Sequence, residues 1–388
     1  MMHIRRSVEL RFVLAVFAMG GFLAAAPMGF AASNGDPDEP SIQAAREPRS
    51  IVEEIQLAND YLAGHGVAQD LKQSAFWFKK AAESGDPHAE MQIGYFYDAG
   101  IGVEKDAQRA AHWYQLAAAG GLPGAKVNLG VLYLWGTGVE KNESLAIEFF
   151  REAAAKGSGL ADCYLGNVYY LGVGVPEDKA QGEQWYKKGA ASHNPQAEYD
   201  LGTLLFTEKD HAHDPGKAAN LFRAAAAAGY VPAMASLGLL LVRNPALAQS
   251  PGEAVDFLNK SAEAGSWKSS MILGVVSRDG KGVLADPSAA YYHFQVAALQ
   301  GGEEARRMAA NDSNVLAARL GPAQTAALDS RAGDWYRQHH VVLEFVYKGS
   351  RAWTLFPNYA LAGPESGTHV TQIVSRLDDL EKPISEMR

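Results

Sequence analysis

A small residue recurs every 36 residues through most of this chain, and this period constrains the fold more than any other feature. The positions are Gly94, Gly130, Gly166, Gly202, Gly238 and Gly274, with Ala58 in the same place one period earlier. An apolar residue precedes each of them, and a tyrosine follows three residues later in the first four copies. Seven copies keep this register without an insertion or a deletion. A period between about 20 and 50 residues indicates a solenoid of stacked supersecondary units.

Each repeat also contains the start and end signals of a helix. One position always carries a good N-cap side chain, whose oxygen accepts hydrogen bonds from the free amides of the first turn. These residues are Asp70, Asp106, Asn142, Asp178, Asp214, Ser250 and Asp286. Proline follows the last three, where its missing N–H does no harm. The helix is expected to end at a left-handed glycine. These glycines are Gly85, Gly121, Gly157, Gly229, Gly265 and Gly301, with His193 as the one departure.

A second helix is expected in every repeat, carrying the apolar-glycine position. Pro87, Pro123 and Pro195 open it in three copies, and alanines near its start allow close approach of a neighbouring helix. Those alanines are Ala89, Ala125, Ala161, Ala197 and Ala233. The aromatic pairs of the first helix, such as Trp77-Phe78, are expected to fill the core between repeats. We therefore predict an all-α fold: a right-handed α/α superhelical solenoid of seven 36-residue helix-pair repeats with a C-terminal helical cap.

The loop between the helices reads Gly-x-Gly-Val in five copies. These begin at Gly64, Gly100, Gly136, Gly172 and Gly280. Two glycines permit positive φ on leaving a helix, and the valine can turn inward. The loop follows a helix rather than a strand, so a nucleotide-binding interpretation is not favoured. Repeats five and six lack this motif. Its place is taken by residues 208–213 in repeat five and by residues 244–247 in repeat six. We expect another loop conformation there, with a specialised contact surface as the alternative.

These motifs together resemble the Sel-1-like repeat, a relative of the tetratricopeptide repeat. Leu-Gly-x-x-Tyr, Gly-x-Gly-Val, an acidic cap and Lys-Ala-Ala-x-x-Gly, seen as residues 80–85, carry the resemblance over about residues 52 to 305. It implies a solenoid whose concave face binds proteins or peptides, as an adaptor or scaffold. Some secreted, cysteine-rich bacterial members have been credited with penicillin binding or β-lactam hydrolysis. This chain has only Cys163, so it departs from that subgroup.

The N-terminus is typical of a secretory signal peptide. Residues 1–31 have a basic opening, an apolar stretch from Phe12 to Ala26 and a small-residue end. Fifteen apolar residues are fewer than the about 20 that cross a bilayer, which favours cleavage and a periplasmic or secreted protein. An uncleaved inner-membrane anchor is the alternative. Cleavage takes the net charge from −9 to −11, because the segment carries three arginines and Glu9. Such a surface argues against nucleic acid or anionic lipid as partner.

The remaining boundaries follow from composition. Residues 32–50 are rich in Pro, Asp and Glu and are expected to be a flexible linker. The repeats occupy residues 51–305. Residues 306–340 are expected to form a helical cap with helices at 315–320 and 323–338, whose outward residues are polar. Those residues are Asp329, Arg331, Asp334 and Arg337. The tail, 341–388, has no assigned role. Its segment 341–347 has the pattern of a strand, and residues 370–380 that of a short helix.

A search for catalytic motifs finds no Gly-x-Ser-x-Gly, His-Glu-x-x-His or phosphate-binding loop. The best metal candidate, residues 211–214, contains two histidines that are more often solvated than ligating. His339-His340 is weaker, since histidine at a helix end also serves the helix dipole. No cofactor, metal or catalytic residue is predicted.

Binding is then expected on helix faces. In such a superhelix one helix of each pair lines the inner surface, and residues one turn around from the buried Leu and Tyr positions would face the groove. Large aromatic side chains there are good anchors for a partner. The candidates are Tyr95, Trp135, Asn167, Tyr170, Tyr199 and Thr203. Packing between repeats is the alternative for several of them.

The sequence thus predicts a non-enzymatic scaffold of the bacterial cell envelope, which binds a protein or peptide partner on its concave face. The alternatives are an envelope hydrolase or β-lactam-binding protein, suggested by the family resemblance, and a module that binds peptidoglycan fragments.

Overall fold

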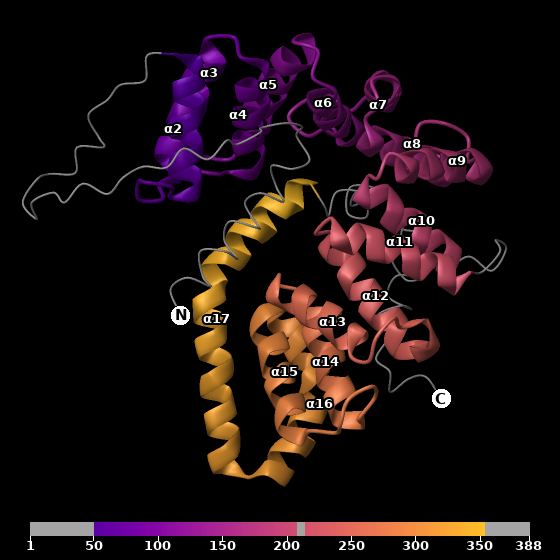
Figure 1. The fold of residues 1–388 in the computed structure, drawn as a ribbon. Coiled ribbons are helices and arrows are strands. Elements are labelled where there is room, and N and C mark those ends of the chain that lie inside the picture. Colours follow the sequence, from indigo (N-terminus) through magenta and orange to yellow (C-terminus); the bar gives the residue numbers. More distant parts are fainter. Residues whose placement is uncertain (1–49, 208–213, 354–388) are drawn as a thin grey trace, which may run out of the picture. The chain divides into compact units, whose positions relative to one another are not determined.

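The computed structural model describes residues 50–207 and 214–353, which form α-helices, one turn of 3-10 helix and no β-strand (Figure 1). The chain divides into two compact units, Met1–Lys156 and Gly157–Arg388. The predicted all-α solenoid of helix pairs is confirmed. The expected signal peptide, the linker up to residue 49 and the short helix at 370–380 lie outside the described residues.

The described part of the first unit, residues 50–156, contains six helices of equal length. They are α2 (Ile51–Ala63), α3 (Leu71–Glu83), α4 (Pro87–Ala99), α5 (Ala107–Ala119), α6 (Pro123–Trp135) and α7 (Glu143–Ala155). Helices α4 and α6 begin at the predicted prolines, while α2 begins after Ser50, whose side chain accepts from the backbone N–H of Glu53. Each helix packs mainly against its direct neighbours in the chain, and the contact within the pairs α2–α3, α4–α5 and α6–α7 is the more extensive one.

The described part of the second unit continues the same alternation, and its last two helices are longer. Its elements are α8 (Gly159–Leu171), α9 (Lys179–Ala191), α10 (Pro195–Thr207), α11 (Pro215–Ala227), α12 (Val231–Arg243), η3 (Pro245–Leu247), α13 (Glu253–Glu263), α14 (Trp267–Asp279), α15 (Pro287–Gln300), α16 (Gly302–Leu320) and α17 (Pro322–Trp353).

The repeated glycine lies where two helices make their closest approach. A Cβ atom on Gly130 would come within 2.6 Å of the ring of Phe150, and one on Gly166 within 2.5 Å of the ring of Tyr186. The same relation joins the other glycines to the residue 20 positions later: Gly94 to Tyr114, Gly202 to Phe222, Gly238 to Leu258 and Gly274 to Phe294. These six partner side chains are buried. The glycine is therefore required by the side chain that packs on it.

The predicted caps are confirmed in six of the seven repeats. The carboxylate of Asp106, for example, accepts from the backbone N–H groups of Gln108 and Arg109, at 3.0 Å each. The backbone N–H of the same residue donates to the carbonyl of Tyr97, 2.8 Å away. Equivalent backbone bonds start at Asp70, Asn142, Asp178, Asp214 and Asp286. Each cap residue thus starts one helix and ties the loop to the end of the preceding helix.

The loop glycines adopt the left-handed conformation that the motif predicts. All ten glycines of the five Gly-x-Gly-Val loops have φ between 66° and 76°. At Gly102 a Cβ would also lie 1.9 Å from the carbonyl oxygen of Leu71, so only glycine fits. His193, the predicted departure among the closing glycines, has φ 55° and is the only non-glycine with positive φ in the described part of the chain. At the last closing position the left-handed residue is Gly302 rather than Gly301, because α15 runs one residue further.

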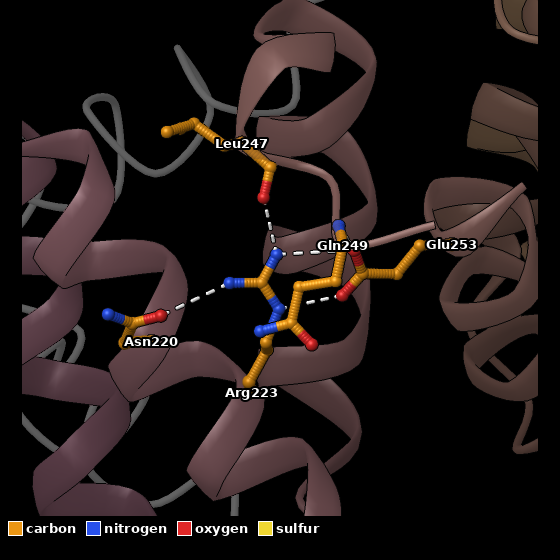
Figure 2. Close-up of polar contacts among 5 residues, drawn as sticks. All are labelled: Asn220, Arg223, Leu247, Gln249 and Glu253. Atoms are coloured by element: carbon orange, nitrogen blue, oxygen red, sulfur yellow. Dashed lines mark hydrogen bonds and ion pairs between the residues drawn. The ribbon is translucent and has the colours of Figure 1, made fainter. Parts of the chain in front are cut away.

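Repeat six corrects one expected cap. Ser250 does not cap a helix: α13 begins at Glu253, after Gly252 with φ 88°, and η3 occupies the place of the glycine loop. The expectation of another loop conformation is confirmed for repeat six, whereas the loop of repeat five, residues 208–213, lies outside the described residues. Figure 2 shows what holds the loop of repeat six. The Arg223 guanidinium donates to both oxygens of Glu253, at 2.7 and 3.2 Å, and to the carbonyl of Leu247 at 2.6 Å. Glu253 also accepts from the backbone N–H of Gln249.

The C-terminal end of the array corrects a second expectation. Residues 341–347, expected as a strand, continue helix α17, and residues 315–320 belong to the longer α16. Helix α17 packs against α15, alongside which it runs in Figure 1. The Tyr291 hydroxyl donates to Asp329 at 3.1 Å, and the Arg331 guanidinium lies 4.4 Å from the centre of the Tyr292 ring. The four predicted outward residues of α17 are exposed, as a polar cap requires.

Replacing Gly166 with alanine is expected to destabilise the second unit by about 1–3 kcal/mol, because the new methyl group overlaps the Tyr186 ring. Gly216→Ala is the matched control. Gly216 also lies in a helix, but a methyl group added there would have its nearest neighbour 3.4 Å away, so the change should be neutral or stabilise by up to about 1 kcal/mol. Urea unfolding followed by circular dichroism measures both. Equal effects of the two substitutions would contradict the packing explanation.

Replacing Glu253 with glutamine is expected to cost up to about 3 kcal/mol, because it leaves the poorly exposed Arg223 guanidinium without its counter-charge. Arg223 holds the pKa of Glu253 below its ordinary value, so the pair stabilises the fold at neutral pH and loses that effect as the pH falls. The control is Glu83→Gln in the pair with Lys79, where both side chains are well exposed; it should cost less than about 0.5 kcal/mol. If Glu253→Gln lowered the free energy of unfolding by the same amount at every pH, this would contradict an ionic contribution of the Arg223–Glu253 pair.

Candidate functional site

The six groove candidates fall into two groups. Tyr95 and Trp135 lie in the first unit, on α4 and α6. The other four lie in the second unit: Asn167 and Tyr170 on α8, and Tyr199 and Thr203 on α10.

Burial separates the candidates further. Tyr95, Asn167, Tyr170 and Tyr199 are between 5% and 7% exposed, whereas Trp135 and Thr203 are half-buried. A buried side chain has little surface to offer a partner until neighbours move. Trp135 and Thr203 therefore retain the most accessible area, and partner binding by any of the six stays a prediction.

The buried candidates make contacts inside the helix stack. The Tyr186 hydroxyl donates to Asn167 Oδ1 over 2.6 Å, and the rings of Tyr170 and Tyr186 are 6.2 Å apart. The Tyr199 ring lies 5.7 Å from Phe222 and 5.3 Å from Tyr230. Alanine at Tyr170 or Tyr199 would leave a cavity. Such variants are expected to lower the stability of the fold, so they do not isolate an effect on binding.

Asp200, which the sequence pattern did not single out, lies in this stack beside Cys163. It is partly exposed on α10, next to Tyr199. The thiol of Cys163, on α8, donates to Asp200 Oδ2 across 2.9 Å. Cys163 itself is completely buried. A carboxylate and a thiol from neighbouring repeats therefore meet between α8 and α10.

The surroundings disfavour negative charge at both groups. Burial raises the pKa of Asp200 to about 7, and the thiol hydrogen bond opposes this shift only in part. Burial and then the charge of Asp200 raise the pKa of the Cys163 thiol well above its ordinary value. Cys163 is thus a protonated donor and not a reactive thiolate.

The charge of Asp200 acts on three tyrosine hydroxyls. The pKa values of the Tyr164, Tyr186 and Tyr230 hydroxyls are raised, first by burial and further by the charge of Asp200. Each of these side chains is 5% exposed. The carboxylate therefore lies among neutral phenols, in an environment of low polarity.

The repeat register could have revealed Asp200. The residues at this position in the other copies are Gln56, Gln92, Asn128, Tyr164, Ser236 and Ile272. All of them are neutral, so Asp200 is the one acid in the row. The first unit has a related arrangement elsewhere in its repeats: Asp98, with a pKa raised by burial, lies near Tyr95 and Tyr114. Lys105 acts in the opposite direction on Asp98, whereas no lysine or arginine does so for Asp200 in the described part of the chain.

Other chemistry is sparse in the described ranges. The side chains that the structure describes, those of residues 50–207 and 214–337, form no group of three or more His, Cys, Asp or Glu that could hold a metal ion. The histidine pair at 211 and 213 lies outside them. None of the described helices combines the length and the apolar character needed to cross a bilayer.

Comparisons with known proteins place these observations in a family. The profile of the Sel1 repeat matches residues 54–86, 87–122, 123–158, 159–194, 195–230, 231–266 and 269–302, which is more than half of the chain. The chain belongs to the Sel1 repeat family. Sel1 repeat proteins are generally protein-interaction scaffolds, and their solenoid is typically non-catalytic. No curated protein is significantly similar to this Sel1 repeat chain.

Several solved structures are similar to this chain. A Sel1 repeat protein from Oxalobacter formigenes is 27% identical with a TM-score of 0.54, over 64% of this chain and 98% of that one. The protein c5321, a protective antigen present in uropathogenic Escherichia coli strains, is 22% identical with a TM-score of 0.39, over 79% of this chain and 71% of that one. The immunity protein Pa5087 from Pseudomonas aeruginosa is 21% identical with a TM-score of 0.40, over 55% and 78%. Because the last two TM-scores are below 0.5, only the Oxalobacter formigenes structure of these three supports the shared fold.

Replacing Asp200 with asparagine is expected to stabilise the protein more at pH 8 than at pH 5. Because the folded-state pKa is raised to about 7, protonation of Asp200 favours the fold at low pH, and this contribution is lost as the pH rises from about 4 to 7. The asparagine side chain stays neutral and does not undergo this loss of stability. The loss is at most about 4 kcal/mol for a pKa shift of this size. Thermal unfolding at both pH values measures the difference.

Asp279→Asn is the matched control with the opposite sign. Arg278 lowers the pKa of Asp279, so this substitution should destabilise the protein more at pH 8 than at pH 3. A pH-independent effect of Asp200→Asn would contradict the raised pKa.

Proposed function

We propose that this Sel1 repeat protein is a non-enzymatic scaffold of the bacterial cell envelope that binds a protein or peptide partner on the helices that carry the Leu-Gly positions. The observation that carries the proposal is the run of seven Sel1 repeats without a gap in register. Such repeats generally bind proteins, and stacked helices offer a long surface for an extended partner.

The envelope location is supported by the sequence of residues 1–31, which has the basic, apolar and small-residue regions of a secretory signal. The related Sel1 repeat protein of Oxalobacter formigenes is bacterial as well. Scaffold activity without catalysis agrees with the described chemistry, in which the thiol of Cys163 is protonated and buried.

Trp135 and Thr203 are the side chains on which partner binding is tested best, because both are accessible in part and lie on Leu-Gly helices. Trp135→Ala and Thr203→Ala together should reduce capture of the partner from envelope extract at least about tenfold, as loss of one aromatic anchor typically does. Capture is measured by cross-linking and quantitative mass spectrometry of the full chain, and circular dichroism confirms that helix content is kept.

The control is Phe76→Ala. Phe76 is a 55% exposed aromatic residue on α3, which does not carry a Leu-Gly position, so its loss should leave capture unchanged. Unchanged capture in the double variant would remove the assigned surface. Nitrocefin turnover above the buffer rate would favour a hydrolase instead. Retention of the chain in the cytoplasmic fraction would contradict the envelope location.

A further inference from the structure

We propose that residues 370–380 of the C-terminal tail bind to an exposed face of helix α16 in the same chain. The residues of this face, the α16 stripe, lie three or four positions apart and are all exposed, so they share one side of the helix. They are Glu304, Met308, Asn311, Val315 and Arg319. This binding is independent of the proposed scaffold function.

The α16 stripe exposes two large apolar side chains. Met308 is 40% exposed and Val315 is 64% exposed. No other helix in the part of the chain with described side chains exposes two large apolar residues. The opposite side of α16 is held in the hydrophobic core through Ala309 and Leu316. The stripe therefore faces away from the core, and a segment that covers it gains apolar contact.

Helix α17 does not cover the α16 stripe. In the repeats, each helix with a Leu-Gly position packs extensively against the helix that follows it, whereas α16 makes only slight contact with α17. Helix α17 packs on α15 instead, where Gln324 donates to Ser288 over 2.8 Å and Tyr291 donates to Asp329. The stripe is thus open to another segment of the chain.

Residues 370–380, expected from the sequence to form a short helix, carry a matching apolar stripe with the spacing of an amphipathic helix. Its residues are Val370, Ile373, Val374, Leu377 and Leu380. Both stripes advance first by three and then by four residues. A parallel pairing therefore places Val370 beside Met308 and Leu377 beside Val315.

Charge favours the parallel orientation. Glu381 follows Leu377 by four residues and Arg319 follows Val315 by four, so this pairing brings an acid beside a base. An antiparallel pairing would bring Glu381 beside Glu304, and like charges repel. Because Arg319 and Glu304 are exposed, these charges select the orientation and add little to the affinity.

The tail is long enough to reach the α16 stripe. Gln324 bonds to Ser288, 36 residues earlier, so the level of Gln300, where α15 ends and α16 begins, corresponds to about Tyr336 in α17. From there α17 continues to Trp353, which is about 25 Å at 1.5 Å per residue. The chain from 354 to 369 then has to return by that distance, and it spans up to about 53 Å when extended.

Because the tail belongs to the same chain, a weak contact is sufficient. A short linker between two binding segments gives an effective concentration on the order of 1 mM. An intrinsic Kd of about 1 mM would therefore keep the α16 stripe covered about half of the time. Two helix turns of apolar contact agree with such a weak interaction.

The test is disulfide formation in the full chain under mild oxidation. Val315→Cys with Leu377→Cys should form an intramolecular disulfide at least about tenfold faster than Val52→Cys with Leu377→Cys, because a disulfide needs Cα atoms within about 7 Å. Val52 is the matched control, a 75% exposed valine on α2 in the other unit. Cys163 is buried and common to both variants. Non-reducing gel electrophoresis and peptide mass spectrometry identify the products.

A charge reversal tests the orientation with the same cysteine pair. Glu381→Arg should slow the intramolecular disulfide at least about threefold, and adding Arg319→Glu should restore the rate, because the pair is then present in reverse. Glu386→Arg is the control, since Glu386 lies beyond the paired residues. Circular dichroism confirms that each variant keeps its helix content.

Equal rates for the Val315 and Val52 pairs would overturn the inference. A disulfide-linked dimer as the main product would also overturn it, because the stripe would then bind a second copy of the chain. Failure of Arg319→Glu to restore the rate, or an equal effect of Glu386→Arg, would contradict the parallel pairing. None of these results bears on the partner-capture experiment.

Discussion

The contact between the repeated glycine and the side chain 20 residues later is the constraint on which the rest of the fold depends. At Gly166 the ring of Tyr186 lies where a methyl group would be, and the same geometry recurs from Gly94 to Gly274. Two helices can lie this close only if one of them lacks a side chain at the crossing. The neighbouring side chains are then fixed as well, because the apolar residue before the glycine and the side chain opposite it are buried together. This explains why the period keeps its length through seven copies even where the loops change.

Much of this architecture could be predicted, because the residues that meet each structural requirement recur in several copies of the repeat. The caps, the left-handed loop glycines and the departure at His193 all follow from local backbone chemistry. The failures have a different origin. The start of α13 depends on a contact between Arg223 and Glu253, which are 30 residues apart. Residues 341–347 have a strand-like composition, but they follow a helix that begins at Pro322 and packs on α15. In both places tertiary contacts decide the outcome, and local sequence does not contain them.

A binding site is harder to predict from the sequence than the fold, for a related reason. The groove residues were chosen one turn away from the core positions, yet a helix inside a stack has neighbours on several sides. A residue one turn away from one helix–helix interface therefore lies in another interface, as the ring contacts of Tyr170 and Tyr199 show. Asp200 was missed because a single acid on a helix carries no motif. It becomes visible only when the copies are compared position by position, and when the absence of a cation among the described residues is known.

The second unit departs from its repeat pattern at two places, the loop of repeat six and Asp200. The two departures differ in how far contacts within the chain compensate for them. In repeat six the lost glycine loop is replaced by a new set of bonds, in which Arg223, Glu253, Leu247 and Gln249 satisfy one another. Such a departure is complete within the chain and is explained by stability. At Asp200 the departure brings a charge into a row of neutral residues, and the fold supplies a thiol and phenols but no cation from the described residues. Because the pKa of Asp200 is raised to about 7, the cost to the folded state is largest where the carboxyl is ionised and falls as the pH falls.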